Sequence, residues 1–341
     1  MSWVGRKFSP GRLVRASNDL IYSQWQRARA LAGALLLGLL FSGCATLESR
    51  GLLKNPPAEL KSQVELVDVP FFPQEEFQCG PAALATALQA KGVKVTPDDL
   101  TKQIFLPGRK GSLQVEMRSA TRRQGMLAVT MSGRIKDLLT EVANGNPVIV
   151  LQNLGLNWYP AWHYAVVVGY DLPRENIILR SGKERRQVLA LTTFEHTWKR
   201  SNYWAIVVVP PSEVPKTATR ESFFASALEM EKIRQPALAE AAYGAALQRW
   251  PNDLAALIGA GNSRYALRNL SGSEQAFRQA TESHPTSIIG WNNLAEVLVE
   301  LDRLPEALTA SERAASLDGP NQAAAQETLT AIRKKIADRN K

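Results

Sequence analysis

The last third of the sequence repeats at an interval of 34 residues. Equivalent positions carry similar residue types in successive copies. The matched sets are Phe223, Leu257 and Trp291; Ala227, Gly261 and Ala295; Tyr243, Phe277 and Ser311; Ala246, Ala280 and Ala314; and Pro251 and Pro285. A unit this short cannot bury its apolar face alone, so successive units must stack to share a core. The interval therefore predicts an all-α array of stacked helix pairs over residues 221–341.

The residue types in this interval resemble the tetratricopeptide repeat (TPR). In that pattern small residues let two helices cross closely, and an aromatic ring fills the gap between them. The final segment, 322–339, is expected to be a capping helix, and prolines at 210, 211 and 215 predict a linker over 212–220. The resemblance implies a surface that binds a peptide or a partner protein. The alternative is that the repeats only space and stabilise the domain before them.

The first 43 residues have the pattern of an export signal. A basic stretch precedes a 12-residue apolar run at 30–41, which as a helix spans about 18 Å and is too short for a bilayer core of about 30 Å. The run ends in FSGC, which resembles the lipobox of bacterial lipoproteins. That resemblance implies cleavage before Cys44 and lipidation of its thiol. Because Ala45 follows, it also implies the periplasmic face of the outer membrane. Residues 44–65 are expected to be a tether.

Charge and residue usage exclude several kinds of site. Of the net charge of +9, +5 lies in the first 43 residues, so the remaining chain carries no basic excess typical of a nucleic-acid-binding protein. Three histidines and two cysteines, without paired-cysteine or HExxH spacing, predict neither a metal site nor a disulfide framework. No cofactor is expected.

The middle segment, 66–211, changes from helical to strand-like patterns along its length. An apolar helix is expected directly after Cys79-Gly80-Pro81, and Thr96 with Asp99 predicts a capping box at the next helix. Further on, apolar runs predict strands at 147–154, 163–171, 176–181 and 203–210. Helices followed by strands predict an α+β domain with an antiparallel sheet.

Three residues of this segment could carry nucleophilic chemistry. Cys79 lies at a predicted helix start, where unpaired N–H groups and the helix dipole should lower the pKa of its thiol. His163 begins a strand and could act as its base. Gln74 could donate a hydrogen bond to the oxyanion that forms on an attacked carbonyl.

The order of Gln74, FQCGPAAL and HYAVVVGYD resembles the bacteriocin-processing, double-glycine leader peptidases, which are papain-like cysteine peptidases. The resemblance covers about residues 66–210. It implies a papain-like fold with Cys79 as nucleophile, His163 as general base and Gln74 as oxyanion donor.

One position departs from that family. An Asp that orients the histidine is expected at the end of the next strand, where this sequence has Ser181. Ser181, Asp171 and Asn176 are therefore alternative orienting residues. Two functions follow: a lipid-anchored periplasmic cysteine peptidase, or an inactive peptidase-like scaffold that binds peptides or envelope proteins.

Overall fold

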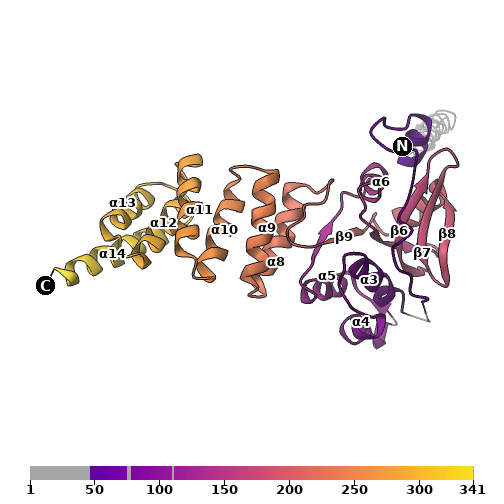
Figure 1. Cartoon of the computed structure of the whole chain (residues 1–341), viewed down its shortest axis with the longest axis horizontal. Coiled ribbons are helices and arrows are strands. Elements are labelled where there is room, and N and C mark those ends of the chain that lie inside the picture. The colour runs from indigo at the N-terminus through magenta and orange to yellow at the C-terminus, as the bar shows by residue number, and fades with distance from the viewer. Residues whose placement is uncertain (1–46, 75–77, 110, 341) are drawn as a thin grey trace, which may run out of the picture. The chain divides into compact units, whose positions relative to one another are not determined.

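The computed structural model describes residues 47–74, 78–109 and 111–340 (Figure 1). The compact unit Glu48–Lys341 contains both predicted domains. The predicted export signal and the predicted lipidation site, Cys44, lie outside the described residues. Among the described helices, none combines the length and the apolar character that crossing a bilayer requires.

A seven-stranded antiparallel sheet forms the centre of the first domain. Its central strands consist almost entirely of buried residues, which explains why the sequence shows continuous apolar runs there. In spatial order the strands are β4 (Leu127–Thr130), β9 (Ala205–Val209), β5 (Val148–Asn153), β6 (Trp162–Asp171), β7 (Asn176–Ser181) and β8 (Glu184–Ala190), and β1 (Gln63–Glu65) pairs with the far end of β6.

Helices cover both faces of this sheet. Alternate residues of β6 point to opposite faces, so Val166 and Val168 join one apolar core while Ala165 and Val167 join the other. The first core includes α3 (Cys79–Ala90), α4 (Pro97–Ile104) and α5 (Gln114–Arg123); the second includes α6 (Ile135–Ala143) and α7 (Leu191–Lys199). The predicted α+β class is confirmed.

The start of α4 has the predicted capping box. The Thr96 side chain accepts a hydrogen bond from the backbone N–H of Asp99, and the Asp99 carboxylate accepts one from the backbone N–H of Thr96. After α4 the chain forms a small hairpin of β2 (Phe105–Leu106) and β3 (Gly111–Ser112). This hairpin lies beside the start of α3, where it contributes to the site described below.

Residues 48–65 are packed onto the first domain, which corrects the predicted tether over 44–65. The first two backbone N–H groups of helix α2 (Glu48–Lys54) donate to the carboxylate of Glu195 in α7, at 2.9 and 2.8 Å. The Glu48 carboxylate in turn accepts the first N–H groups of α6. The backbone N–H groups at the starts of α2 and α6, which have no partner within their helices, are thus hydrogen-bonded to two carboxylates.

The second domain is all-α, as the 34-residue interval predicts. Its helices follow one another in antiparallel pairs, and the last of them is the predicted capping helix (Figure 1). They are α8 (Arg220–Lys232), α9 (Pro236–Arg249), α10 (Leu254–Ala266), α11 (Leu270–Ser283), α12 (Ile288–Glu300), α13 (Leu304–Ala315) and α14 (Gln322–Arg339). Trp291 is only half-buried, and its indole N–H donates to the Pro285 carbonyl at 3.0 Å.

The first repeat helix packs directly against the sheet. Phe223 and Ala227 of α8 belong to the same apolar core as Leu127 and Val129 of β4. The Ser226 hydroxyl donates to the Ala128 carbonyl at 3.0 Å. The repeats therefore continue the core of the sheet domain, and the expected linker at 212–220 does not separate the two.

A glycine in α10 tests the packing of neighbouring repeat helices. A methyl group at Gly261 would overlap the buried ring of Phe277 in α11. We expect Gly261→Ala to lower the free energy of unfolding by up to about 2 kcal/mol, because overpacking costs about 1–3 kcal/mol and the gain in helix propensity offsets about 1 kcal/mol of it. Urea unfolding of the full chain, followed by circular dichroism, measures this change.

Gly244 provides the matched control. It lies within α9, and no atom is close enough to contact an added methyl group. Gly244→Ala is therefore expected to raise the free energy of unfolding by about 0.5–1 kcal/mol. Equal effects of the two substitutions would contradict the packing described for Gly261.

Candidate active site

Cys79 is the first residue of α3, as the sequence predicts. The next residue, Gly80, lies against the small hairpin: a methyl group at Gly80 would lie 2.7 Å from the Cβ of Ser112 and closer still to its hydroxyl. Only glycine lets the hairpin approach the start of α3 this closely. The loop at 105–112 therefore borders the reactive thiol.

The thiol of Cys79 lies beside the beginning of β6. The backbone N–H of Tyr164 donates toward the Cys79 sulfur, as do the backbone N–H groups of Cys79 and Gly80. His163 directly precedes Tyr164, so its Cα is only about 3.8 Å away along the chain. Within the described residues no hydrogen bond joins the thiol and the imidazole. The sequence motifs did not point to Tyr164, although its position directly after His163 was an available signal.

Ser181 holds one nitrogen of the His163 ring. The Nε2 atom of His163 and the hydroxyl oxygen of Ser181 are 2.9 Å apart. Asp171 is eight residues further along β6, about 26 Å at the usual rise of a strand, and Asn176 pairs with it. Of the three alternatives only Ser181 therefore contacts the imidazole.

Gln74 is hydrogen-bonded to residues beside His163 and Ser181, through both its backbone and its side chain. Its backbone N–H donates to the carbonyl of Gly182 at 2.9 Å. Its side-chain Nε2 donates to the carbonyl of Tyr164 at 3.4 Å, and the side chain is 8% exposed. The structure thus brings Gln74 to the residue after His163 and to the residue after Ser181.

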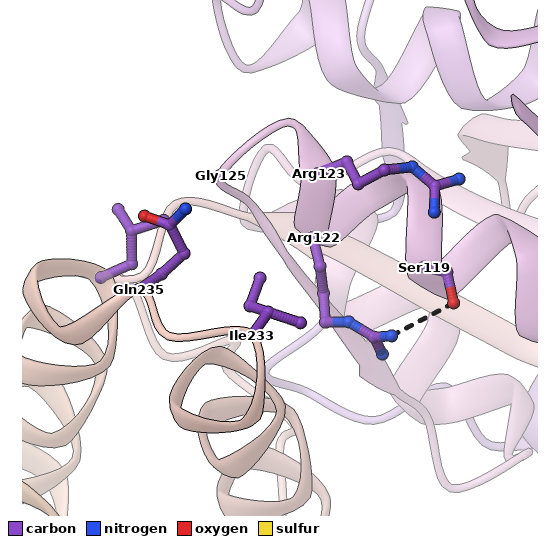
Figure 2. A pocket seen from close by; sticks show the side chains of 7 residues that line it. Ser119, Arg122, Arg123, Gly125, Ile233 and Gln235 are labelled. Atoms are coloured by element: carbon purple, nitrogen blue, oxygen red, sulfur yellow. Dashed lines mark hydrogen bonds between the residues drawn. The ribbon is translucent and has the colours of Figure 1, made fainter.

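A separate pocket of about 510 Å³ lies where α5 meets the α8–α9 turn (Figure 2). Its Arg122 donates to the Ser119 hydroxyl at 3.1 Å and forms an ion pair with Glu229 at 2.9 Å. The charge of Arg122 is therefore paired, whereas Arg123 donates to the neutral side chain of Gln103. None of the four predicted site residues lines this pocket.

The sequence matches two protein-family models. Residues 66–206 match the Peptidase_C39 like family. Residues 225–288 and 259–326 match the tetratricopeptide repeat. The sheet domain is a C39-like peptidase domain. The helical region that follows it is a TPR array.

Several solved structures are similar to parts of the chain. A putative C39-like peptidase from Bacillus anthracis is 21% identical, with a TM-score of 0.37, covering 46% of this chain and 100% of that one. PcrH in complex with the chaperone-binding region of PopD is 18% identical, with a TM-score of 0.32 and coverages of 34% and 91%. The Yersinia enterocolitica type III secretion translocator chaperone SycD is 18% identical, with a TM-score of 0.33 and coverages of 34% and 85%. No curated protein is significantly similar to the chain.

Burial dominates the electrostatics of the C39-like site. It raises the pKa of the Cys79 thiol, and the backbone N–H groups of Tyr164, Gly80 and Cys79 offset this only in part. Burial also lowers the pKa of His163, because the charged imidazolium is the poorly solvated form. The predicted lowering of the thiol pKa is therefore wrong, and both groups are neutral at pH 7.

This electrostatic state predicts how the thiol reacts with pH. Because the pKa of Cys79 is raised, the thiolate fraction increases throughout the range below it, so alkylation by iodoacetamide should accelerate about tenfold per unit from pH 7 to 8.5. Peptide mass mapping of the alkylated full chain assigns the rate to Cys79. A rate that reached its plateau below pH 7 would contradict the raised pKa.

Proposed function

We propose that the protein is a lipid-anchored cysteine peptidase that hydrolyses peptide bonds in the periplasm. The observation that supports this most is the meeting of four segments at one place: the start of α3 with Cys79, the start of β6 with His163, the end of β7 with Ser181, and Gln74. A nucleophile, a base, an orienting group and an amide donor are the parts that acyl transfer needs.

Because the Cys79 thiol and the His163 imidazole are both neutral, the first proton transfer runs from the thiol to the imidazole. Nδ1 of His163 takes the thiol proton as the sulfur attacks the carbonyl carbon, while Nε2–H donates to Ser181. Gln74 and the Cys79 backbone N–H stabilise the oxyanion. The imidazolium then protonates the departing amine, which leaves an acyl thioester on Cys79. Water, deprotonated by His163, hydrolyses the thioester and restores the thiol.

Packing of α2 supports a short connection to the membrane. Cys44 is four residues from Glu48, whose N–H binds Glu195, so the covalent reach between them is at most about 14 Å. A lipid on Cys44 would hold the peptidase domain close to the periplasmic face of the outer membrane. Intact mass of membrane-extracted protein should correspond to a chain beginning at acylated Cys44. An unprocessed N-terminus would refute the anchor.

We further propose that the TPR array recruits a protein partner or substrate to the peptidase domain. TPR repeats generally mediate protein–protein interaction. Direct packing of α8 on β4 supports this role, because it fixes the first repeat on the domain that carries Cys79.

Hydrolysis itself is tested with a peptide mixture, because the substrate is unidentified. Proteome-derived peptides are incubated with the full chain and analysed by mass spectrometry for new termini. A matched sample is first alkylated with iodoacetamide at pH 8.5. New termini that disappear after alkylation support the proposal, and their absence from both samples refutes it.

Substitution of Ser181 tests the orienting role. Ser181→Ala should lower turnover by about three- to tenfold, the value of one neutral hydrogen bond of about 0.5–1.5 kcal/mol. Ser181→Asp should preserve or raise turnover, because a carboxylate accepts from Nε2 and also stabilises the imidazolium. Steady-state kinetics on a cleaved peptide measure both changes. A loss of turnover with Asp as large as that with Ala would contradict an orienting role.

A further inference from the structure

The connection between β5 and β6, together with the flanking strand residues Asn153 and Trp162, presents apolar side chains to solvent. Trp158 is 81% exposed and Tyr159 is 74% exposed, and Leu154, Leu156 and Trp162 are each more than half exposed. Single exposed apolar residues are ordinary on a protein surface, but five within ten residues are not. We call residues 153–162 the aromatic hairpin.

Hydrogen bonds fix the shape of the aromatic hairpin. Leu156 and Tyr159 exchange two backbone bonds at 3.1 Å. The Asn153 side chain accepts from the N–H groups of Gly155 and Ala161 at 3.0 and 2.9 Å. Directly after α7, the Arg200 guanidinium donates to the carbonyls of Asn153 and Gly155 at 3.3 and 2.8 Å. The apolar side chains are therefore held outward by an ordered loop.

Glycine at position 155 is required for this shape. A methyl group there would lie 2.9 Å from the Ala161 nitrogen and closer still to the Tyr159 carbonyl oxygen. The rings of Trp158 and Tyr159 contact each other, with centroids 6.1 Å apart. Trp158 and Trp162 are both exposed and lie outside the apolar cores.

The aromatic hairpin leads directly into the reactive residues. Its last residue, Trp162, precedes His163 in β6. In the proposed reaction the imidazolium protonates the departing amine, so the peptide segment C-terminal to the cleaved bond leaves on the side of His163. A surface that continues from His163 therefore faces the leaving segment of the substrate.

We propose that the aromatic hairpin binds apolar side chains of the substrate just C-terminal to the cleaved bond. Residues 153–162 contain no charged residue, which suits aliphatic and aromatic substrate side chains and disfavours charged ones. This inference rests on the proposed peptidase function for the direction of the peptide. Contact between the hairpin and apolar peptides does not require turnover.

The first test compares cleavage preferences. The native full chain and its Trp158→Ala/Tyr159→Ala variant are incubated with proteome-derived peptides. We expect native cleavage sites to be enriched in Leu, Ile, Val and Phe at the first positions after the cut, and the variant to reduce this enrichment about tenfold. Val188→Ala, an exposed apolar position in β8 of the sheet domain, is the control and should not alter the preference. An unchanged preference in the hairpin variant would overturn the proposal.

The second test measures binding without hydrolysis. Both proteins carry Cys79→Ala, and one of them also carries the hairpin substitutions. An unstructured peptide rich in Leu and Phe should bind at least about tenfold more weakly to the protein with the substituted hairpin. A matched peptide with Ser at those positions should bind the two proteins equally. Weaker binding of the Leu- and Phe-rich peptide supports the inference even if the native protein cleaves nothing. The test can therefore succeed or fail independently of the proposed peptidase function. Equal binding overturns the inference. The proposal is also overturned if the hairpin substitutions reduce binding to phosphatidylethanolamine–phosphatidylglycerol vesicles but leave peptide binding unchanged. That result would assign the hairpin to a membrane surface.

Discussion

Cys79→Ala is expected to reduce peptide hydrolysis by about 10⁴-fold or more, because loss of the nucleophile leaves only binding and oxyanion stabilisation. Cys79 carries the most reactive nucleophile of the site, a thiol, and is the residue proposed to form the acyl intermediate. The side chain is small and half-buried at the start of α3, so alanine should preserve the fold. Steady-state hydrolysis of a peptide identified from the cleavage mixture measures the loss.

Cys79→Ser is the control for this substitution. It keeps the shape of the side chain and a hydrogen-bonding group, yet a serine hydroxyl is much harder to deprotonate than a thiol. Hydrolysis should therefore remain near that of Cys79→Ala, while circular dichroism and thermal unfolding remain near those of the native chain. Native-like hydrolysis by either variant would show that another group performs the reaction.

The repeat interval predicted the second domain well, because its physics is local. Each 34-residue unit contacts mainly its neighbours, so the pattern of small and aromatic residues maps directly onto helix contacts. Gly261 opposite Phe277 is one such contact. The direct packing of α8 on β4 was not predictable, since Phe223 and Ser226 fit the repeat pattern whether or not they meet another domain.

Two elements of the first domain escaped prediction, each for its own reason. The strand β8 is mostly exposed and contains Glu184, Arg185 and Arg186, so it lacks the apolar pattern of a buried strand. The helix α2 looked like a polar tether because its stability depends on Glu195, far away in the sequence. A segment such as α2 can be identified from the sequence only when its partner is known.

The sequence motifs pointed to residues that the structure brings together, but not to the electrostatics around them. A helix start at Cys79 indicated a lowered thiol pKa, but the burial that raises it comes from tertiary packing. Choosing Ser181 over Asp171 required the register of β6 and β7, which includes an irregularity between Val167 and Gly169. Such a shift cannot be read from an apolar run.

Gln74→Ala is expected to lower turnover about 10²-fold, the usual cost of removing one oxyanion donor. The buried Gln74 amide donates to the Tyr164 carbonyl at 3.4 Å, beside the thiol, and it has a second N–H for the oxyanion. Because the charge develops only in the transition state, the loss should appear in kcat with little change in KM.

Alkylation and a second glutamine separate this role from a structural one. Reaction of Cys79 with iodoacetamide forms no oxyanion, so its rate should be nearly the same in Gln74→Ala as in the native chain. Gln89 lies near the other end of α3, about 15 Å from Cys79 along the helix, and its amide also donates to a backbone carbonyl, that of Val95 at 2.9 Å. Gln89→Ala removes a comparable hydrogen bond and should leave kcat unchanged. If both substitutions lowered kcat equally, or if Gln74→Ala slowed alkylation as much as hydrolysis, Gln74 would support the position of the thiol and would not stabilise the oxyanion.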